Sequence, residues 1–249
     1  MRLLQTTSKE AIIYEQFGYD ISSTAGNEVI GNCVFCNKDN HFYVNKNTLA
    51  FSCKRCGQEG SWRYFLKKFY EKHIISKERC KFLSQKRGIP LPGIERWKFA
   101  EYNGKFFLPA YDTNLEVSDL RMWKAGGKEH SIKGGKVGLV NLLEVGQHES
   151  EPIYICEAYF TAIALDWLLK RTGKKGVVVS TGGANTFRED WMYHFNGRKA
   201  IVCFDHDEAG YGKIHNMKAT GSKKVEARIQ NSAKSVSFVT WPKNYITGS

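Results

Sequence analysis

Four cysteines in two CxxC pairs are the first residues of this sequence whose spacing suits a metal. The pairs are CVFC and CKRC, with 16 residues between them, and they contain Cys33, Cys36, Cys53 and Cys56. Two turns that each present two thiolates can bind one tetrahedral Zn²⁺. We therefore expect one structural zinc ion at these four residues. His41 lies between the pairs, but four thiolates already complete the zinc shell, so we expect His41 to be a structural or surface residue.

Three acidic residues could bind a second kind of metal. Glu157 follows the apolar stretch 152–156, and Asp205 and Asp207 follow the apolar stretch 199–204. A DxD pair alone is often a solvated loop, but a third carboxylate at a matching strand end favours a site. Converging carboxylates suit Mg²⁺ or Mn²⁺, which prefer oxygen ligands and bridge to substrate phosphates. We therefore predict a catalytic metal site at Glu157, Asp205 and Asp207.

The acidic residues need a parallel sheet to bring them together. PIYICEA, GVVVSTGG and RKAIVCFDHDEAG have the composition of strands, and YFTAIALDWLLKRTG has that of a helix. This alternation predicts an α/β fold with a parallel sheet over residues 149–249. The carboxyl ends of parallel strands meet at one edge, where ligands bind. Gly182 and Gly183 fall at the same predicted edge as the acids.

The upstream sequence predicts smaller, mostly β units. Between the cysteine pairs, HFYVNKNTLAFSC predicts two short strands, and SWRYFLKKFYEKH predicts a helix. FAEYNGKFFLPAYDTNLEVSDLRMW predicts short strands joined by NG and DTN turns. We therefore expect a multi-domain protein of mixed α/β and α+β class. Its predicted parts are a zinc ribbon at 1–70, a linker with a helix at 71–98, a small subdomain of short strands at 99–148 and the α/β unit at 149–249.

The charge of the chain favours a polyanionic partner. The sequence has 37 Lys and Arg against 25 Asp and Glu, a formal net charge of +12. Basic and aromatic residues crowd the ribbon and its helix, a mixture that suits phosphates and stacked bases. The alternative of a solvated helix whose aromatic side is core stays open. The residues expected to contact DNA are Lys54, Arg55, Trp62 and Arg63.

Composition and missing motifs exclude several classes. With 42% apolar residues the chain can bury a core, so disorder is excluded as its main state. No stretch approaches the roughly 20 apolar residues of a membrane span, and the N-terminus lacks the apolar core of a signal peptide. We therefore expect no membrane partner and a cytoplasmic location. The GxxxxGK[ST] motif of a P-loop motor is also absent from the sequence.

Several motifs resemble a known family in sequence and in order. IYICEAYFTAIAL, VVVSTGGANTF and IVCFDHDEAGYGKIHNMKA resemble a TOPRIM domain. CVFC, HFYV and AFSCKRCGQEGSWRYFL resemble the zinc-binding domain of DnaG-type primases. FFLPAYDTNLEVSDLRMW and GGKEHSIKGGKVGLVNL resemble the basic subdomain that precedes TOPRIM in these enzymes. The order of the three pieces is similar to that of the primase half of phage primase-helicases.

The resemblance implies a DNA primase that makes RNA primers on single-stranded DNA from ribonucleoside triphosphates. It implies that Glu157, Asp205 and Asp207 are the metal acids. It further implies that Arg121, Lys124 and Lys128 hold nucleotide or template. The implied partner is a replicative hexameric helicase, as a separate chain or as a C-terminal half, and the implied location is the cytoplasm of a bacterial cell or a phage-infected host.

The sequence also departs from the family pattern. Glu157 is followed by Ala158 where the family has Gly, Thr161 stands where many members have Asp, and Asn244 stands where a late acid is expected. Two alternatives stay open. One is a TOPRIM-type nuclease or topoisomerase-like enzyme, although a topoisomerase would need a cleaving Tyr in a further domain. The other is a non-catalytic zinc-ribbon module that binds single-stranded DNA.

Overall fold

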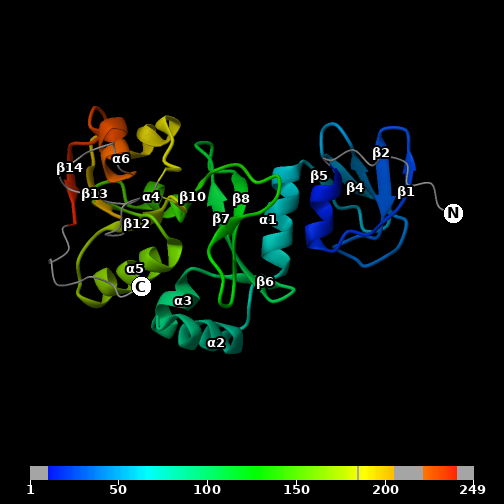
Figure 1. Ribbon diagram of the computed structural model, residues 1–249, viewed down its shortest axis with the longest axis horizontal. Coiled ribbons are helices and arrows are strands. Elements are labelled where there is room, and N and C mark those ends of the chain that lie inside the picture. Colours follow the sequence, from blue (N-terminus) through cyan, green and yellow to red (C-terminus); the bar gives the residue numbers. More distant parts are fainter. Residues whose placement is uncertain (1–10, 184, 205–220, 240–249) are drawn as a thin grey trace.

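The computed structural model describes residues 11–183, 185–204 and 221–239. In Figure 1 a small sheet lies at one end of the molecule, a large sheet occupies the other end, and helix α1 (Trp62–Lys72) stands between them. None of the helices in these described ranges has the length and hydropathy needed to cross a membrane.

The small sheet is antiparallel and carries the cysteine pairs at its turns. Within residues 11–72 it has five strands, which follow one another in the order of the chain. A short 3₁₀ helix, η1 (Ala11–Phe17), precedes them. The strands are β1 (Ile21–Ala25), β2 (Glu28–Gly31), β3 (Phe42–Asn45), β4 (Phe51–Cys53) and β5 (Glu59–Gly60). The two strands predicted between the cysteine pairs are thus β3 and β4.

Helix α1 joins the small sheet to the large one. Its N-cap is Ser61, whose Oγ accepts a hydrogen bond from the backbone N–H of Tyr64, as Ser commonly does at this position. Phe65 and Phe69 are buried in a core that also contains Phe107 and Leu120 of the large sheet. The zinc ribbon and the basic subdomain therefore share one hydrophobic core through α1.

Polar contacts fasten the ribbon to the basic subdomain as well. The Gln16 side chain donates to the backbone carbonyl of Lys133 at 2.8 Å and accepts from the Lys133 backbone N–H at 3.0 Å. Trp62 Nε1 donates to the carbonyl of Gly134 at 3.1 Å. Both contacts are made to the backbone of Lys133 and Gly134, so they fix the ribbon relative to the basic subdomain.

The large sheet is mixed, and its parallel part lies at the C-terminal end. In the described part of the chain it has nine strands, in the order β14-β13-β11-β12-β10-β7-β8-β9, with β6 paired to β7. The antiparallel strands are β6 (Ala100–Tyr102), β7 (Lys105–Tyr111), β8 (Val117–Lys124), β9 (His130–Ser131) and β10 (Leu139–Val140). The strands of the parallel part are β11 (Ile153–Cys156), β12 (Val177–Ser180), β13 (Lys199–Cys203) and β14 (Ser235–Phe238).

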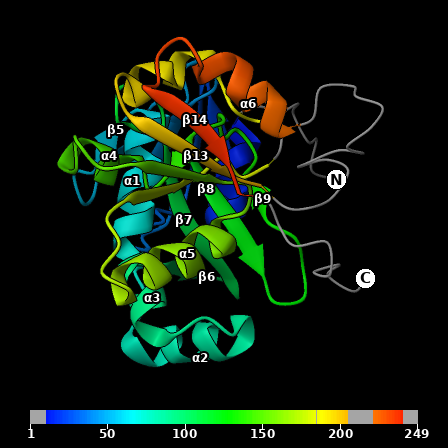
Figure 2. The same ribbon diagram turned by 90° about the vertical axis from the view of Figure 1, so that its left-hand side faces the viewer.

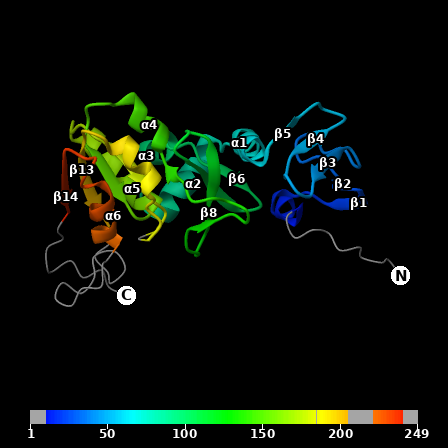
Figure 3. The same cartoon turned by 90° about the horizontal axis from the view of Figure 1, so that it is seen from above.

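Helices cover both faces of the parallel strands (Figures 2 and 3). One face is covered by α5 (Tyr159–Arg171), with α3 (Leu91–Arg96) packed on α5 and α2 (Lys77–Arg87) packed on α3. The other packs on α4 (Leu142–Gln147), the 3₁₀ helix η2 (Glu189–Phe195) and α6 (Gly221–Ile229). Apolar residues on both sides of each strand give the continuous hydrophobic runs that the sequence shows for β11 and β12.

The predicted fold class is confirmed: an antiparallel sheet with four cysteines precedes a mixed α/β part with parallel strands. Two details go beyond the prediction. Residues 71–98 form α2 and α3, and α3 packs against α5. The large sheet also runs across the predicted boundary at residue 148, because β10 pairs with both β7 and β12.

Candidate active site and zinc cluster

The four cysteines of the two CxxC pairs meet at one point. Cys33 Sγ lies 3.9 Å from Cys56 Sγ, and Cys36 Sγ lies 3.9 Å from Cys53 Sγ. A tetrahedral Zn²⁺ with Zn–S bonds of about 2.3 Å requires sulfur–sulfur distances of roughly 3.8 Å. The four donors therefore fit a zinc ion. His41, which the sequence placed outside the shell, is exposed.

The four residues expected to contact DNA have two kinds of surroundings. Lys54 and Arg55 are exposed beside the cysteine cluster. Trp62 is half-buried and stacks on Phe65, with the ring centroids 5.5 Å apart. The Arg63 guanidinium is ion-paired with carboxylates that flank the β7–β8 turn, those of Asp112 at 2.6 Å and Glu116 at 2.5 Å. Lys54 and Arg55 are thus open to a ligand, whereas Trp62 and Arg63 contact the neighbouring subdomain.

Glu157 lies at the carboxyl end of β11. Cys156, directly before it, is in register with Ser180 of β12 and with Cys203 of β13, so three parallel strands end together here. Glu157 lines a cavity of about 370 Å³ at this edge. The other described residues that line it are Arg87, Trp123, Gly127, Lys128, Glu129, Ala158, Gly182 and Gly183. Asp205 and Asp207 lie outside the described residues, so their role stays a prediction.

The loop after β12 forms one wall of this cavity and is held from two sides. Ser180 Oγ donates to the backbone carbonyl of Glu157 at 3.0 Å. The buried Arg121 side chain donates to the carbonyl of Gly182 at 2.7 Å and to Ser131 Oγ at 2.6 Å. Arg121, predicted to hold nucleotide or template, thus lies behind the wall and fixes the loop beside Glu157.

Gly182 is required by this packing. Its φ is +68°, and an added Cβ would lie 2.6 Å from Arg121 Cζ. We expect Gly182→Ala to displace the loop beside Glu157 and to lower the free energy of unfolding by about 1–3 kcal/mol for backbone strain and by a further ~1–3 kcal/mol for the overpacked contact with Arg121. Gly197→Ala is the matched control, since Gly197 has a φ of +67° and nothing within 4 Å of its added Cβ. Chemical denaturation would test this, and equal losses in the two variants would contradict the Arg121 contact.

The two predicted lysines lie apart. Lys128 lines the cavity with Glu157. Lys124 is exposed at the end of β8 and is not among the lining residues. The structure therefore brings Lys128 to Glu157 and leaves Lys124 outside the cavity.

Sequence reasoning missed two charged residues of the cavity. Arg87 ends α2, and its guanidinium lies 4.0 Å from the ring centroid of Phe160 and 5.3 Å from that of Trp123. Glu129 accepts hydrogen bonds from the backbone N–H groups of α5. The local sequence around these two residues does not indicate a site, because Arg87 precedes a break with Gly and Pro and Glu129 lies in a polar loop. Their contacts in the cavity are made with segments far along the chain.

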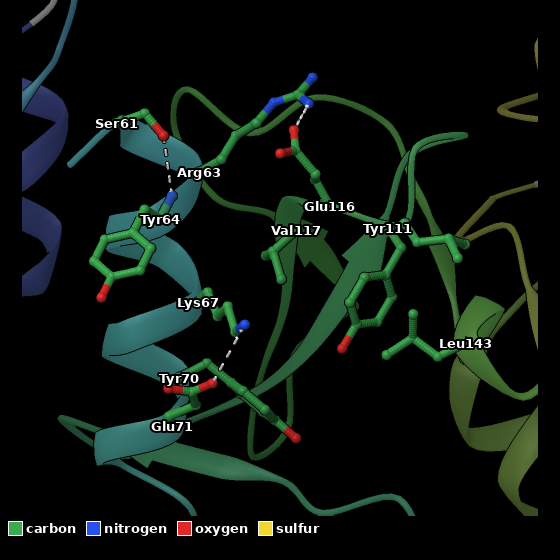
Figure 4. A pocket seen from close by; sticks show the side chains of 11 residues that line it. Ser61, Arg63, Tyr64, Lys67, Tyr70, Glu71, Tyr111, Glu116, Val117 and Leu143 are labelled. Atoms are coloured by element: carbon green, nitrogen blue, oxygen red, sulfur yellow. Dashed lines mark hydrogen bonds and ion pairs between the residues drawn. The ribbon is translucent and has the colours of Figure 1, made fainter.

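A second cavity lies between α1 and the start of β8 (Figure 4). Its volume is about 420 Å³. Tyr64, Tyr70 and Tyr111 give it an aromatic lining, and the ion-paired Arg63 and Glu116 stand at one side. It shares no lining residue with the Glu157 cavity.

Comparisons with known proteins bear on the C-terminal part most directly. Residues 154–236 match the family model described as Toprim-like. No curated protein matches the sequence.

Three solved structures have a similar arrangement. The Aquifex aeolicus primase with its zinc-binding and RNA polymerase domains shares 16% identity over 95% of this chain and 78% of that chain, with a TM-score of 0.47. The primase fragment of the bacteriophage T7 primase-helicase shares 15% identity over 86% of this chain and 90% of that chain, with a TM-score of 0.43. The E. coli primase catalytic core shares 15% identity over 68% of this chain and 78% of that chain, with a TM-score of 0.42. The match over 154–236 confirms the resemblance of this part of the chain to a TOPRIM domain.

Proposed function

We propose that this protein is a DNA primase, a nucleotidyltransferase that makes short RNA primers on single-stranded DNA. One observation carries the proposal. In a Toprim-like segment, Glu157 ends a parallel strand in a cavity that also contains Lys128 and Arg87. A carboxylate beside two cations suits a metal-bound triphosphate, because the carboxylate can hold the metal and the cations can offset phosphate charge. The four-cysteine ribbon before it supports the same proposal.

Each of these residues would have its own role in the reaction. Glu157 would hold a divalent cation, Mg²⁺ or Mn²⁺, together with Asp205 and Asp207. When bound, such an ion supplies charge stabilisation for the triphosphate and orients the attacking hydroxyl. Lys128 and Arg87 would bind the triphosphate oxygens. Arg121 would keep the Gly182 loop in place behind them.

The ribbon would recognise the template. Lys54 and Arg55 are exposed next to the zinc cluster, where they can reach DNA phosphates. Lys124, also exposed, would contact the template strand outside the cavity. The proposed partners are single-stranded DNA, ribonucleoside triphosphates and a replicative hexameric helicase.

Synthesis without a primer tests this function. The chain is incubated with mixed-sequence single-stranded DNA, labelled ribonucleoside triphosphates and Mg²⁺ or Mn²⁺. We expect short labelled oligoribonucleotides that require both template and metal. DNA binding without any product, with or without metal, would favour the non-catalytic binding module instead.

A further inference from the structure

The first turn of α5 takes its cap from a distant part of the chain. The N-cap residue is Ala158, which has no side-chain group that could accept a hydrogen bond. Glu129, 30 residues before Tyr159, fills this place. Its carboxylate accepts from the backbone N–H of Tyr159 at 3.2 Å and from that of Phe160 at 3.4 Å. An acidic group is favourable here because the N-terminus of a helix carries partial positive charge.

The cap is set among charged groups of the cavity. Burial raises the pKa of Glu129, and the N–H groups of Tyr159 and Phe160 oppose this rise. Arg121 and Arg87 also oppose it, through their positive charge. Tyr159 and Phe160 belong to α5, Arg121 belongs to β8 and Arg87 belongs to α2. Glu129 therefore lies where the elements that form the cavity meet.

The loop that carries Glu129 needs an anchor. It contains Gly126, at φ +81°, and Gly127, so its backbone is conformationally permissive. Trp123 Nε1 fixes one end by donating to the carbonyl of Gly127 at 2.9 Å. Glu129 fixes the other end on α5, and Lys128 lies between the two anchors.

The cap thus connects two sides of the cavity. Lys128 is the residue before Glu129. Glu157 lies two residues before Tyr159, whose backbone N–H donates a hydrogen bond to Glu129. We propose that Glu129 is a positioning residue that ties the Lys128 loop to the first turn of α5 and so fixes Lys128 relative to Glu157. The inference rests on the proposed function, since it assigns Lys128 and Glu157 to one metal–nucleotide site.

Three variants of the full chain test the inference. Glu129→Ala removes the cap, and Glu129→Gln keeps a carbonyl oxygen that can accept one N–H. The control is Glu151→Gln, because Glu151 is also half-buried and accepts from a backbone N–H, that of Gly176 at 2.9 Å, at the opposite end of β11. The affinity for ATP with Mg²⁺ is measured by equilibrium binding, alongside thermal unfolding and the KM and kcat of synthesis.

We expect Glu129→Ala to weaken ATP binding roughly 10- to 100-fold, the range found when groups that orient a site are removed, and to raise KM. Glu129→Gln should recover part of this loss. Glu151→Gln should leave ATP affinity unchanged, even where its unfolding temperature falls as far as that of Glu129→Ala.

Two results would overturn the inference while the proposed function stands. One is a Glu129→Ala protein that binds ATP as well as Glu151→Gln does. The other is a loss of ATP affinity that excess Mg²⁺ restores in full, which would place Glu129 at the metal. A wild-type chain that neither binds ATP nor makes primers would contradict the proposed function itself.

Discussion

Replacing Glu157 with Gln should reduce primer synthesis roughly 100- to 1,000-fold, the range typical for loss of one group that stabilises transition-state charge. The amide has nearly the same shape but no negative charge, so it would hold a divalent cation poorly. Single-stranded DNA binding should be kept, because the exposed basic residues of the ribbon are unchanged. The measurement is the initial rate of synthesis at saturating nucleotide, with DNA affinity measured in parallel.

Glu151→Gln is the matched control for this prediction. The two glutamates flank the same strand, β11, with Glu151 before its start and Glu157 after its end. The control removes the same charge at the edge of the sheet away from the cavity, so it should keep the wild-type rate. Wild-type synthesis by Glu157→Gln would show that Glu157 does not hold the metal.

The second prediction concerns zinc. Cys33→Ser should remove the metal and unfold the ribbon, because zinc binding at such sites contributes about 10–16 kcal/mol to folding. The loss of folded structure should extend to the basic subdomain. Phe65 and Phe69 of α1 share one buried core with the ribbon residues and with Phe107 and Leu120 of the large sheet. The two cores on the faces of β11, β12 and β13, as far as the described residues define them, include no residue of the ribbon or of α1, so these strands should stay folded.

Zinc content, circular dichroism and thermal unfolding check this second prediction. The control is Cys80→Ser, since Cys80 is buried in α2, away from the cluster, and should leave one zinc per chain. A Cys33→Ser protein that keeps a full equivalent of zinc would disprove the ligand assignment. Zinc loss with an unchanged unfolding profile would disprove the shared core.

Local patterns in the sequence were enough to predict most of the elements. The apolar run of residues 152–156 and the helical spacing after it gave β11 and α5, and the NG turn at Asn103 gave the β6–β7 hairpin. The CxxC spacing was likewise sufficient for the cysteine cluster, because two turns of that length have few ways to present four thiolates.

What sequence reasoning missed depends on contacts between distant segments. The contacts of Trp62 and Arg63 with Gly134, Asp112 and Glu116 of the neighbouring subdomain were not predicted, and the predicted contact of these two residues with DNA stays a prediction. Glu129 caps a helix that begins 30 residues later, and no local pattern encodes such a cap. The extent of α2 was hard to predict because its residues follow no clear helical period. It packs on α3, and its last residue, Arg87, lies over the ring of Phe160 in α5, far along the chain.

The most direct test of the central claim follows template and product in one reaction. The wild-type chain and Glu157→Gln are each incubated with 5′-labelled single-stranded DNA, ribonucleoside triphosphates and Mg²⁺, and the nucleic acids are identified by mass spectrometry. We predict short RNA complementary to an intact template for the wild type, and none for Glu157→Gln. A cleaved template without RNA would contradict primer synthesis and indicate a nuclease at the Glu157 cavity.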